Sequence, residues 1–338
     1  MKILRDLGER SIISSILPKY CEAIGDDCAV LSTDGIDVVI TTDPVPDAAA
    51  RVIGGDDDPY WMGRLLVTIN ASDLSAAAAT PMAFLSAIEC PADMQLNQFE
   101  RLLSGIADAC KAEELRYVGG NLKESPRVVA TGIAVGYCPK GKALHRKGAL
   151  DGDVLLAVGS GGIFWRDALN LKNGNKVVEK AGSPIYQPVS QLKNMALLAA
   201  AVPIRVAMDN SDGLLATLEQ LASVNNMSVI LDLDQLTVPD ARPLGVDEAR
   251  LWLGWGDWNV LIGSDPTDLA KIMQVATDNN FFVRAIGEFK NGVPRAFVNR
   301  GAVMKEAPRL ESERFAADSW FASGIEGYIK TLLTIQLP

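Results

Sequence analysis

Short apolar segments rich in β-branched residues alternate along this chain with longer segments of helical spacing. Residues 36–42 (IDVVITT) are typical of a strand, whereas the alanine-rich residues 61–79 are typical of a helix. The alternation continues to residue 286, and 338 residues are more than one hydrophobic core usually holds. The pattern therefore predicts two domains that combine helices with sheets, divided near residue 150.

The remaining segments follow the same two patterns. Further strands are expected at 28–32, 83–89, 127–137, 154–158, 204–208, 228–233, 258–263 and 281–286. Further helices are expected at 8–19, 95–113, 187–201, 213–225, 246–253 and 266–279. Pro81 is expected to end the helix at 61–79, because proline cannot continue a helical hydrogen-bond ladder. Residues beyond 286 are expected to form a tail.

The composition excludes several classes of function. The formal net charge of −10 argues against nucleic-acid binding, which needs clustered lysine and arginine. The polar N-terminal residues and the short apolar runs predict neither a signal peptide nor a membrane helix, so we expect a cytoplasmic protein. Five scattered cysteines without a CxxC pair predict neither a disulfide framework nor a zinc site. His145 is the one histidine, so carboxylates and cations must carry any catalysis.

Aspartates stand where the predicted strands and helices end. The set comprises Asp26, Asp27, Asp43, Asp73, Asp209 and Asp212. Each alone is equally well explained as a helix cap or a turn residue. Mg²⁺ is bound by oxygen ligands, often one or two carboxylates together with substrate phosphates. As a set, these aspartates indicate a site for Mg²⁺ around a triphosphate.

Two expected glycine turns could expose backbone amides to a phosphate. They are Gly119-Gly120 and Gly159–Gly162, and neither matches the P-loop or the dinucleotide pattern. For Gly159–Gly162 alone, a tight turn without a ligand is the better explanation. Lys123 and Arg146 lie near glycine-containing segments and are candidates for offsetting phosphate charge.

Several segments, in one order, resemble thiamine-monophosphate kinases of the aminoimidazole-ribonucleotide synthase-related superfamily. The matching segments are Gly8-Glu9, IGDDCAVL at 24–31, TTD at 41–43, NASDLSA at 70–76, ATP at 79–81, GGN at 119–121, LHRKGA at 144–149, MDNSDGL at 208–214 and IGE at 286–288. They cover roughly residues 8 to 290.

The resemblance implies a two-domain fold of α/β plus α+β type. Residues 1–150 would form an α/β domain that binds metal and nucleotide and whose mixed sheet forms a homodimer, and residues 151–338 an α+β domain that completes the cleft for ATP and substrate. The implied Mg²⁺ ligands are Asp26, Asp27, Asp43, Asp73, Asn121, Asp209 and Asp212. The implied nucleotide contacts are Gly119, Gly120, Asn121, Lys123, Arg146 and Ser211. Asp43, Asp212 and Arg146 would carry the catalysis.

The chain departs from the family pattern where the family shapes its acceptor site. Asn121 replaces an aspartate of the family, so a ligand charge is lost. The EGVHF segment after Asp43 is absent, and GGEDYELL is replaced by GWGDWNVL at 254–261. Trp255, Asp257, Trp258 and Trp320 are candidate substrate contacts, although tryptophans more often pack in cores.

These observations favour Mg-ATP-dependent phosphoryl transfer to a small molecule through an altered acceptor pocket. Two alternatives remain. An ATP-dependent synthase would activate a carbonyl or amide oxygen, and a regulator would bind the nucleotide without catalysis. The kinase-like N-terminal segment and SDGL at 211–214 favour the kinase, whereas Asn121 motivates the regulator.

Overall fold

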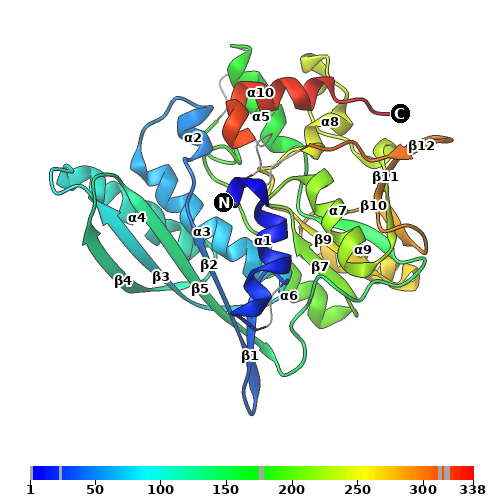
Figure 1. The fold of residues 1–338 in the computed structure, drawn as a ribbon, viewed down its shortest axis with the longest axis horizontal. Coiled ribbons are helices and arrows are strands. Elements are labelled where there is room, and N and C mark those ends of the chain that lie inside the picture. The colour runs from blue at the N-terminus through cyan, green and yellow to red at the C-terminus, as the bar shows by residue number, and fades with distance from the viewer. Residues whose placement is uncertain (1–2, 23–24, 175–178, 311–313, 316–319) are drawn as a thin grey trace.

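Two mixed sheets organise the chain. The computed structural model describes residues 3–22, 25–174, 179–310, 314–315 and 320–338 (Figure 1). The N-terminal sheet has the order β1-β2-β5-β3-β4 and the C-terminal sheet the order β12-β11-β8-β10-β6-β9-β7. Each sheet contains one parallel pair, β3 with β4 and β11 with β8, among antiparallel neighbours. The fold predicted from the sequence, with its mixed sheet in the N-terminal half, is confirmed.

The elements of the N-terminal half have the following bounds. The strands are β1 (Ala29–Ser32), β2 (Ile36–Pro44), β3 (Thr80–Cys90), β4 (Arg116–Glu124) and β5 (Val129–Pro139). The helices are α1 (Glu9–Ser15), α2 (Ala49–Val52), α3 (Pro59–Ala76) and α4 (Leu96–Ala112). Short 3-10 turns lie at Leu4–Asp6 and Leu17–Lys19.

The C-terminal half holds the second sheet and its helices. Its strands are β6 (Val154–Val158), β7 (Val206–Asp209), β8 (Ser228–Asp232), β9 (Val260–Ser264), β10 (Val283–Lys290), β11 (Ala296–Arg300) and β12 (Val303–Glu306). Its helices are α5 (Ile163–Lys172), α6 (Leu192–Ala201), α7 (Leu214–Asn225), α8 (Glu248–Leu253), α9 (Leu269–Asp278) and α10 (Trp320–Thr334). Short 3-10 turns lie at Leu233–Gln235, Arg242–Leu244 and Pro266–Asp268.

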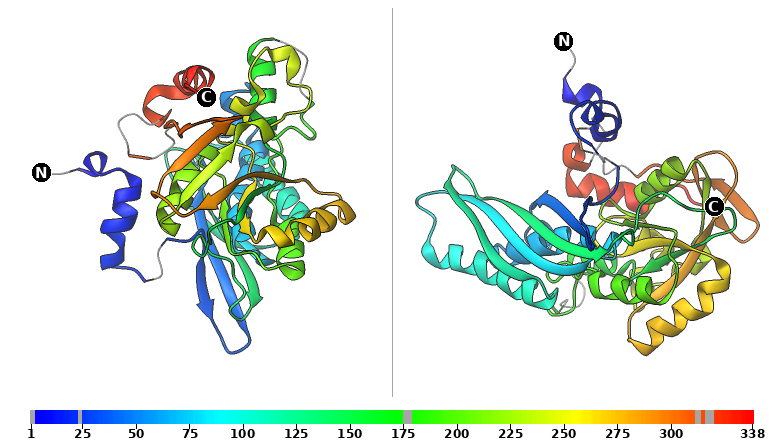
Figure 2. Two further views of the ribbon diagram at one scale, coloured as in Figure 1. Left: turned by 90° about the vertical axis from the view of Figure 1, so that its right-hand side faces the viewer. Right: turned by 90° about the horizontal axis from the view of Figure 1, so that it is seen from below.

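Helices cover only one face of the N-terminal sheet. Along β5, Ala130, Gly132, Ala134 and Gly136 are buried, whereas the residues between them are half-buried. Successive strand residues point to opposite faces, so this alternation separates a covered face from an open one. In the right-hand view of Figure 2, α4 lies below the sheet, and none of the helices in the described part of the chain covers its concave upper face.

Helix α3 lies between the two halves and belongs to both cores. It begins at Pro59, where the side chain of Asp58 accepts a hydrogen bond from the Tyr60 amide at 3.0 Å. Leu65 and Ile69 pack in the core of the C-terminal half, whereas Leu66 packs under the N-terminal sheet. Most of its residues are buried, including polar ones such as Asn70 and Ser72, as expected for a helix enclosed on more than one side. No helix among the described residues is long and apolar enough to cross a membrane.

Several predicted elements differ from the structure. The residues around Gly119-Gly120 form the edge strand β4 rather than a turn, with a register shift opposite Phe84 and Ser86. Pro81 lies inside β3, and the helix ends at Ala76 before it. The helix expected at 187–201 begins at Leu192, after Pro188. Helices α2, α5 and α10 and strands β11 and β12 were not among the predicted elements.

Helices α3 and α4 cross in close backbone contact at two glycines. A Cβ atom on Gly63 would lie 2.2 Å from the carbonyl oxygen of Leu102, and one on Gly105 would lie 2.0 Å from that of Tyr60. Both contacts are with backbone, so neither can be relieved by a side-chain rotation. The crossing fixes α3 against α4 and thereby the position of the residues that α3 carries.

Replacing Gly105 by alanine should lower the free energy of unfolding by about 2 to 3 kcal/mol, because the added methyl group forces the two helices apart. Gly35→Ala is the matched control, since a Cβ there meets nothing within 4 Å. Urea denaturation followed by circular dichroism measures both. Equal stability of the two variants would show that the close crossing is not required.

Candidate metal centre and adjoining pocket

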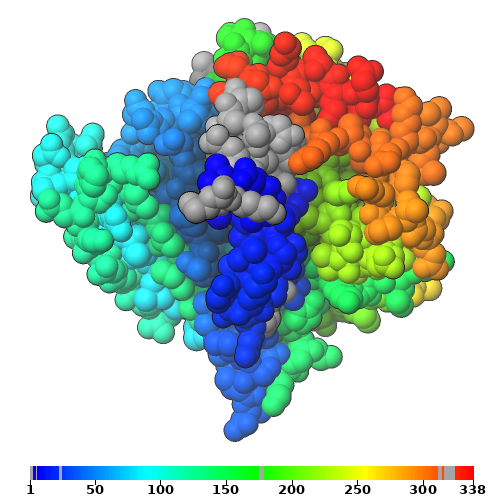
Figure 3. All heavy atoms as spheres, viewed as in Figure 1, coloured from blue at the N-terminus to red at the C-terminus, as the bar shows by residue number. Residues whose placement is uncertain are grey.

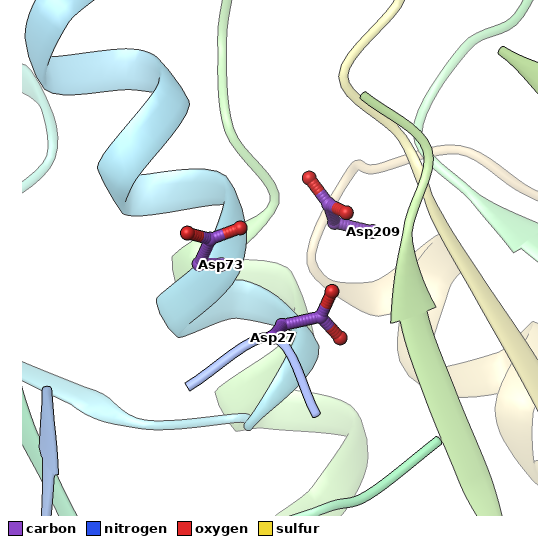
Figure 4. Close-up of side chains that lie close together, drawn as sticks. All are labelled: Asp27, Asp73 and Asp209. Carbon is purple, nitrogen blue, oxygen red and sulfur yellow. The ribbon is translucent and has the colours of Figure 1, made fainter. Parts of the chain in front are cut away.

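Three aspartates from three separate elements converge where the two halves meet. Asp27 precedes β1, Asp73 lies on α3 and Asp209 ends β7. One oxygen from each carboxylate lies within 4.8 Å of the other two, and Figure 4 shows the side chains pointing toward a common space. The ligand set consists of carboxylate oxygens alone, which suits a hard cation such as Mg²⁺.

Hydroxyl groups hold the carboxylates in place. Thr41 Oγ1 donates to Asp73 Oδ2 at 2.5 Å, Ser72 Oγ to Asp209 Oδ2 at 3.1 Å, and Ser211 Oγ to Asp209 Oδ1 at 3.2 Å. The bond from Ser72 joins α3 to β7, so the cluster is complete only when the two halves are docked. These donors also offset part of the charge of Asp73 and Asp209.

Asp43 and Asp212 extend the cluster toward a cavity. The buried Asn70 of α3 fixes the end of β2, because its Oδ1 accepts from the Asp43 amide at 3.0 Å while its Nδ2 donates to the Leu66 carbonyl at 2.9 Å. Asp43 is close enough to Asp73 for its negative charge to contribute to the raised pKa of Asp73. Asp43 and Asp212 both line the cavity described below.

Burial raises the pKa of each of these carboxyl groups. It raises the pKa of Asp43 to about 6, and the negative charge of Asp212 adds to the effect while Arg314 opposes it. Burial, followed by the charges of neighbouring aspartates, also raises the pKa values of Asp73 and Asp209. Negative charge in this region is therefore costly to the protein, and a bound cation would remove that cost.

Arg146 and His145 hold the loop that carries Asp26 and Asp27. Both Nε and Nη2 of Arg146 donate to Asp27 Oδ1, the first at 3.1 Å. Asp26 does not face the three-carboxylate cluster, because its oxygens bind the Arg146 amide at 2.9 Å and His145 Nδ1 at 2.8 Å. Burial opposes the charge of Arg146, but the Asp27 carboxylate outweighs it and raises the pKa of the guanidinium.

Beside Asp43 and Asp212 lies a cavity of about 140 Å³ with largely apolar walls. Trp61 and Tyr186 form one aromatic pair on its wall, and Phe164 and Trp255 form another. Trp258 also lines it, with a left-handed φ of 53° that is unusual for a bulky residue. Two of the predicted substrate contacts, Trp255 and Trp258, therefore lie on the cavity wall, and the side chain of Trp320 is outside the described residues.

The structure corrects the prediction for Asp257. Its carboxylate is buried and accepts hydrogen bonds from the amides of Gly162 at 2.6 Å and Phe164 at 2.9 Å, at the start of α5. Burial raises its pKa to about 7. Asp257 therefore occupies the position at the Gly159–Gly162 turn where a phosphate could have bound, and it does not line the cavity.

The predicted nucleotide contacts on β4 lie away from the aspartates within one chain. Asp43 pairs with Gly132, Gly132 with Ser86, and Ser86 with Gly120. Three strand spacings separate Asp43 from Gly120, which is about 14 Å. The same holds for the neighbouring Gly119, Asn121 and Lys123, which are exposed on the edge strand.

The sequence analysis did not identify most residues of the cavity wall, although the spacing of residues on α3 indicated some of them. Trp61, Leu65, Ile69 and Asp73 are spaced by four on α3, which places them on one face of the helix from the cavity to the carboxylate cluster. Tyr186 lies in a proline-rich segment without periodicity and offered no such signal.

Figure 3 shows the N-terminal segment lying across the front of the molecule, where Glu9 of α1 contributes to the raised pKa of Asp212.

The raised pKa values predict that the stability of the protein depends on pH differently with and without Mg²⁺. A folded-state pKa above the unfolded value means that the folded protein binds more protons, so without a divalent cation its stability should rise as pH falls from about 8 to about 5. With saturating MgCl₂ this rise should disappear, because the cation replaces the protons. Differential scanning calorimetry in EDTA and in MgCl₂ measures both profiles. Identical profiles would contradict cation binding at these carboxylates.

Comparison with known proteins finds two matching domain models and several relatives. The model of the AIR synthase related protein N-terminal domain matches residues 25–138, and that of the C-terminal domain matches residues 151–298. A thiamine-monophosphate kinase from Pyrococcus abyssi is 25% identical over 312 residues, covering 90% of this chain and 95% of the relative. Another from Caulobacter vibrioides is 28% identical over 278 residues, covering 79% of this chain and 78% of the relative.

Solved structures share the fold. The tt0281 protein from Thermus thermophilus superposes with a TM-score of 0.78 at 25% identity, covering 91% of this chain and all of the other. AaThiL complexed with AMPPCP and TMP superposes with a TM-score of 0.75 at 21% identity, covering 90% of this chain and 98% of the other. The two domain matches and these relatives show that this chain belongs to the AIR synthase-related proteins, as a thiamine-monophosphate kinase-like member.

Proposed function

We propose that this protein transfers the γ-phosphoryl group of Mg-ATP to a small-molecule acceptor. The observation that carries the proposal is the continuity of the acidic cluster with an apolar cavity through Asp43 and Asp212. Kinase chemistry needs metal-neutralised phosphates next to a site that orients the acceptor. The named activity of the relatives, thiamine-monophosphate kinase, supports the same reaction class.

The acidic residues would have different roles in binding the metal and in positioning the reacting groups. Asp27, Asp73 and Asp209 would hold Mg²⁺, with Asp43 and Asp212 at the boundary between the nucleotide phosphates and the acceptor. The bound ion would neutralise charge on the transferring phosphoryl group. Asp26 is better assigned to holding the loop than to binding metal, because its oxygens are engaged by His145 and Arg146.

Positive charge near the phosphates would come from two arginines. Arg146 adjoins the carboxylate cluster, and Arg314 lines the cavity close enough to lower the pKa of Asp43. Ser211 lies on the same loop as Asp209 and also lines the cavity. The exposed segment of β4 from Gly119 to Lys123 remains a candidate for the more distant part of the nucleotide.

In the transfer step, an oxygen of the acceptor bonds to the γ-phosphorus while the bond from that phosphorus to the β–γ bridging oxygen breaks, and ADP leaves. Neither histidine nor cysteine occurs among the described residues of the cavity wall. A phosphate acceptor has no proton to lose, and an alcohol could give its proton to Asp43. Positioning and charge would dominate the rate, as a loose transition state requires.

Phosphorus NMR of the protein with Mg-ATP and candidate acceptors distinguishes the possible reactions. A phosphorylated acceptor together with ADP supports the kinase. Free phosphate with a cyclised or amidated product would indicate a synthase instead. Bound but intact ATP with every acceptor would indicate a nucleotide-binding regulator and contradict the proposal.

Asp212→Asn should lower kcat by about a hundredfold, because the change removes a carboxylate that would help to hold the cation at the phosphates. Asp93→Asn, in an exposed turn between β3 and α4, is the control and should retain full activity. The thermal midpoint of both variants should match that of the parent protein. A folded Asp212→Asn variant with full kcat would exclude this aspartate from catalysis.

We also infer that the boundary between the two domains lies near residue 150. We further infer a homodimer built on the open face of the N-terminal sheet. The half-buried residues of β5 on that face include Ile133 and Val135, and Val38 and Ile40 of β2 lie on it beside them. A broad apolar sheet face exposed to water is unfavourable and marks an interaction surface. A second copy would cover it.

Val135→Lys should convert the dimer to a monomer, since it places a charge in the centre of this face. Leu96→Lys is the control, because Leu96 is 70% exposed on α4, which covers the opposite face. Sedimentation velocity gives the mass of each variant. A Val135→Lys protein that sediments as the parent does would place the contact elsewhere.

A further inference from the structure

A buried amide fastens the end of strand β2 to helix α3. The side chain of Asn70 is fully buried, and its Oδ1 accepts a hydrogen bond from the Asp43 amide at 3.0 Å. Its Nδ2 donates to the carbonyl oxygen of Leu66 at 2.9 Å and lies 3.4 Å from that of Asp43. We propose that Asn70 is a positioning residue for phosphoryl transfer, and that it acts by holding the backbone of Asp43. This inference rests on the proposed function and concerns a residue that acts on the reaction through Asp43.

The orientation of the Asn70 amide follows from its two partners. A carbonyl oxygen only accepts a hydrogen bond and a backbone amide only donates one, so Nδ2 faces Leu66 and Oδ1 faces Asp43. Because Leu66 lies one helical turn before Asn70, its carbonyl oxygen holds the side chain in one direction relative to α3. A leucine at residue 70 would have a similar size but could make neither bond. The amide therefore adds to packing a specific hold on Asp43.

Strand β5 leaves the space in which Asn70 reaches Asp43. Gly132 of β5 lies opposite Asp43 in the sheet. A Cβ atom on Gly132 would lie 2.3 Å from Asn70 Nδ2 and 2.8 Å from the ring of Phe84. The backbone of Gly132 is not left-handed, so glycine is needed at this position for space rather than for conformation. The missing side chain at residue 132 makes room for the amide of Asn70.

A second bond joins the same two elements in the opposite direction. Thr41 of β2 donates from its Oγ1 to Asp73 Oδ2 at 2.5 Å. Asn70 and Asp73 are three residues apart on α3 and therefore lie on one face of the helix. Asn70 thus holds Asp43 while Thr41 holds Asp73, so this pair of bonds fixes the two acidic residues relative to each other. Loss of the Asn70 amide would free the end of β2, and a displacement of about 1 Å at a reacting group can lower the rate about a hundredfold.

The nucleotide should still bind when Asn70 is replaced. Asp27 is held by Arg146 and Asp209 by Ser72, through bonds that do not involve Asn70. Replacement of Asn70 should therefore lower kcat without a comparable rise in KM for Mg-ATP. A purely structural role would instead lower the thermal midpoint and leave kcat unchanged at temperatures where the variant is folded.

The test measures ADP release from Mg-ATP with thiamine monophosphate and with water alone as acceptor. We expect Asn70→Leu to lower kcat at least about tenfold and to keep KM for Mg-ATP within about twofold of the parent value. Ser75→Ala is the control, because Ser75 is also fully buried on α3 and its Oγ donates to the Ala71 carbonyl oxygen at 2.7 Å. Full kcat in a folded Asn70→Leu variant would overturn the positioning role and leave the kinase proposal intact. A parent protein that releases no ADP with either acceptor would contradict both.

Glycine substitutions on β5 test the same contact without changing Asn70, and they serve if Asn70→Leu does not fold. Gly132→Ala should lower kcat at least about tenfold, because the added methyl group displaces the amide of Asn70. Gly136→Ala is the matched control on the same face of β5, where a Cβ atom would lie 2.8 Å from the Thr80 carbonyl oxygen and 2.9 Å from Ala79 Cβ. Both variants should have a lower thermal midpoint, but only Gly132→Ala should lose kcat. The same kcat in both folded variants would overturn the positioning role.

Discussion

Mutual repulsion between buried carboxylates is the constraint on which the rest of this structure depends. Asp209 is buried and Asp73 half-buried at the junction of the two halves, and Asp27 approaches them from a third segment. Like charges at this separation in a region of low dielectric cannot all be retained without compensation. Hydroxyl donors and Arg146 supply part of it, and a divalent cation would supply the remainder. The carboxylate cluster is therefore suited to hold a divalent cation next to the phosphates of a nucleotide.

Helix α3 fixes the positions of the residues that form the carboxylate cluster and the cavity. Its close crossing with α4 fixes it under the N-terminal sheet, while Ser72 bonds to Asp209 of the other half. One face of the helix carries Trp61 at the cavity and Asp73 at the carboxylate cluster. The distance between metal and acceptor is therefore set within a single rigid element, and phosphoryl transfer depends on such positioning.

The sequence revealed the parts of the site that lie at the ends of regular elements. Asp73 and Asp209 could be selected because they lie near the ends of apolar segments. The alternation of patterns predicted helices and strands, whereas the mixed sheet was expected from the family resemblance. Asp257 was expected to contact the substrate, but its partners are backbone amides that only the folded turn brings together. Gly119-Gly120 lie in a strand rather than the expected turn, because glycine also occurs where another strand's backbone approaches closely, as Ser86 does at Gly120. The contact of Tyr186 with α3 depends on docking of the two halves, which no local pattern encodes.

The most direct test of the account is a crystal of the protein grown with MnCl₂ and a non-hydrolysable ATP analogue, examined by anomalous scattering. We expect a manganese peak coordinated by carboxylate oxygens of Asp27, Asp73 and Asp209, with the γ-phosphate of the analogue directed toward Asp43 and the cavity. A structure in which the analogue is bound and the metal contacts none of these three aspartates would contradict the account.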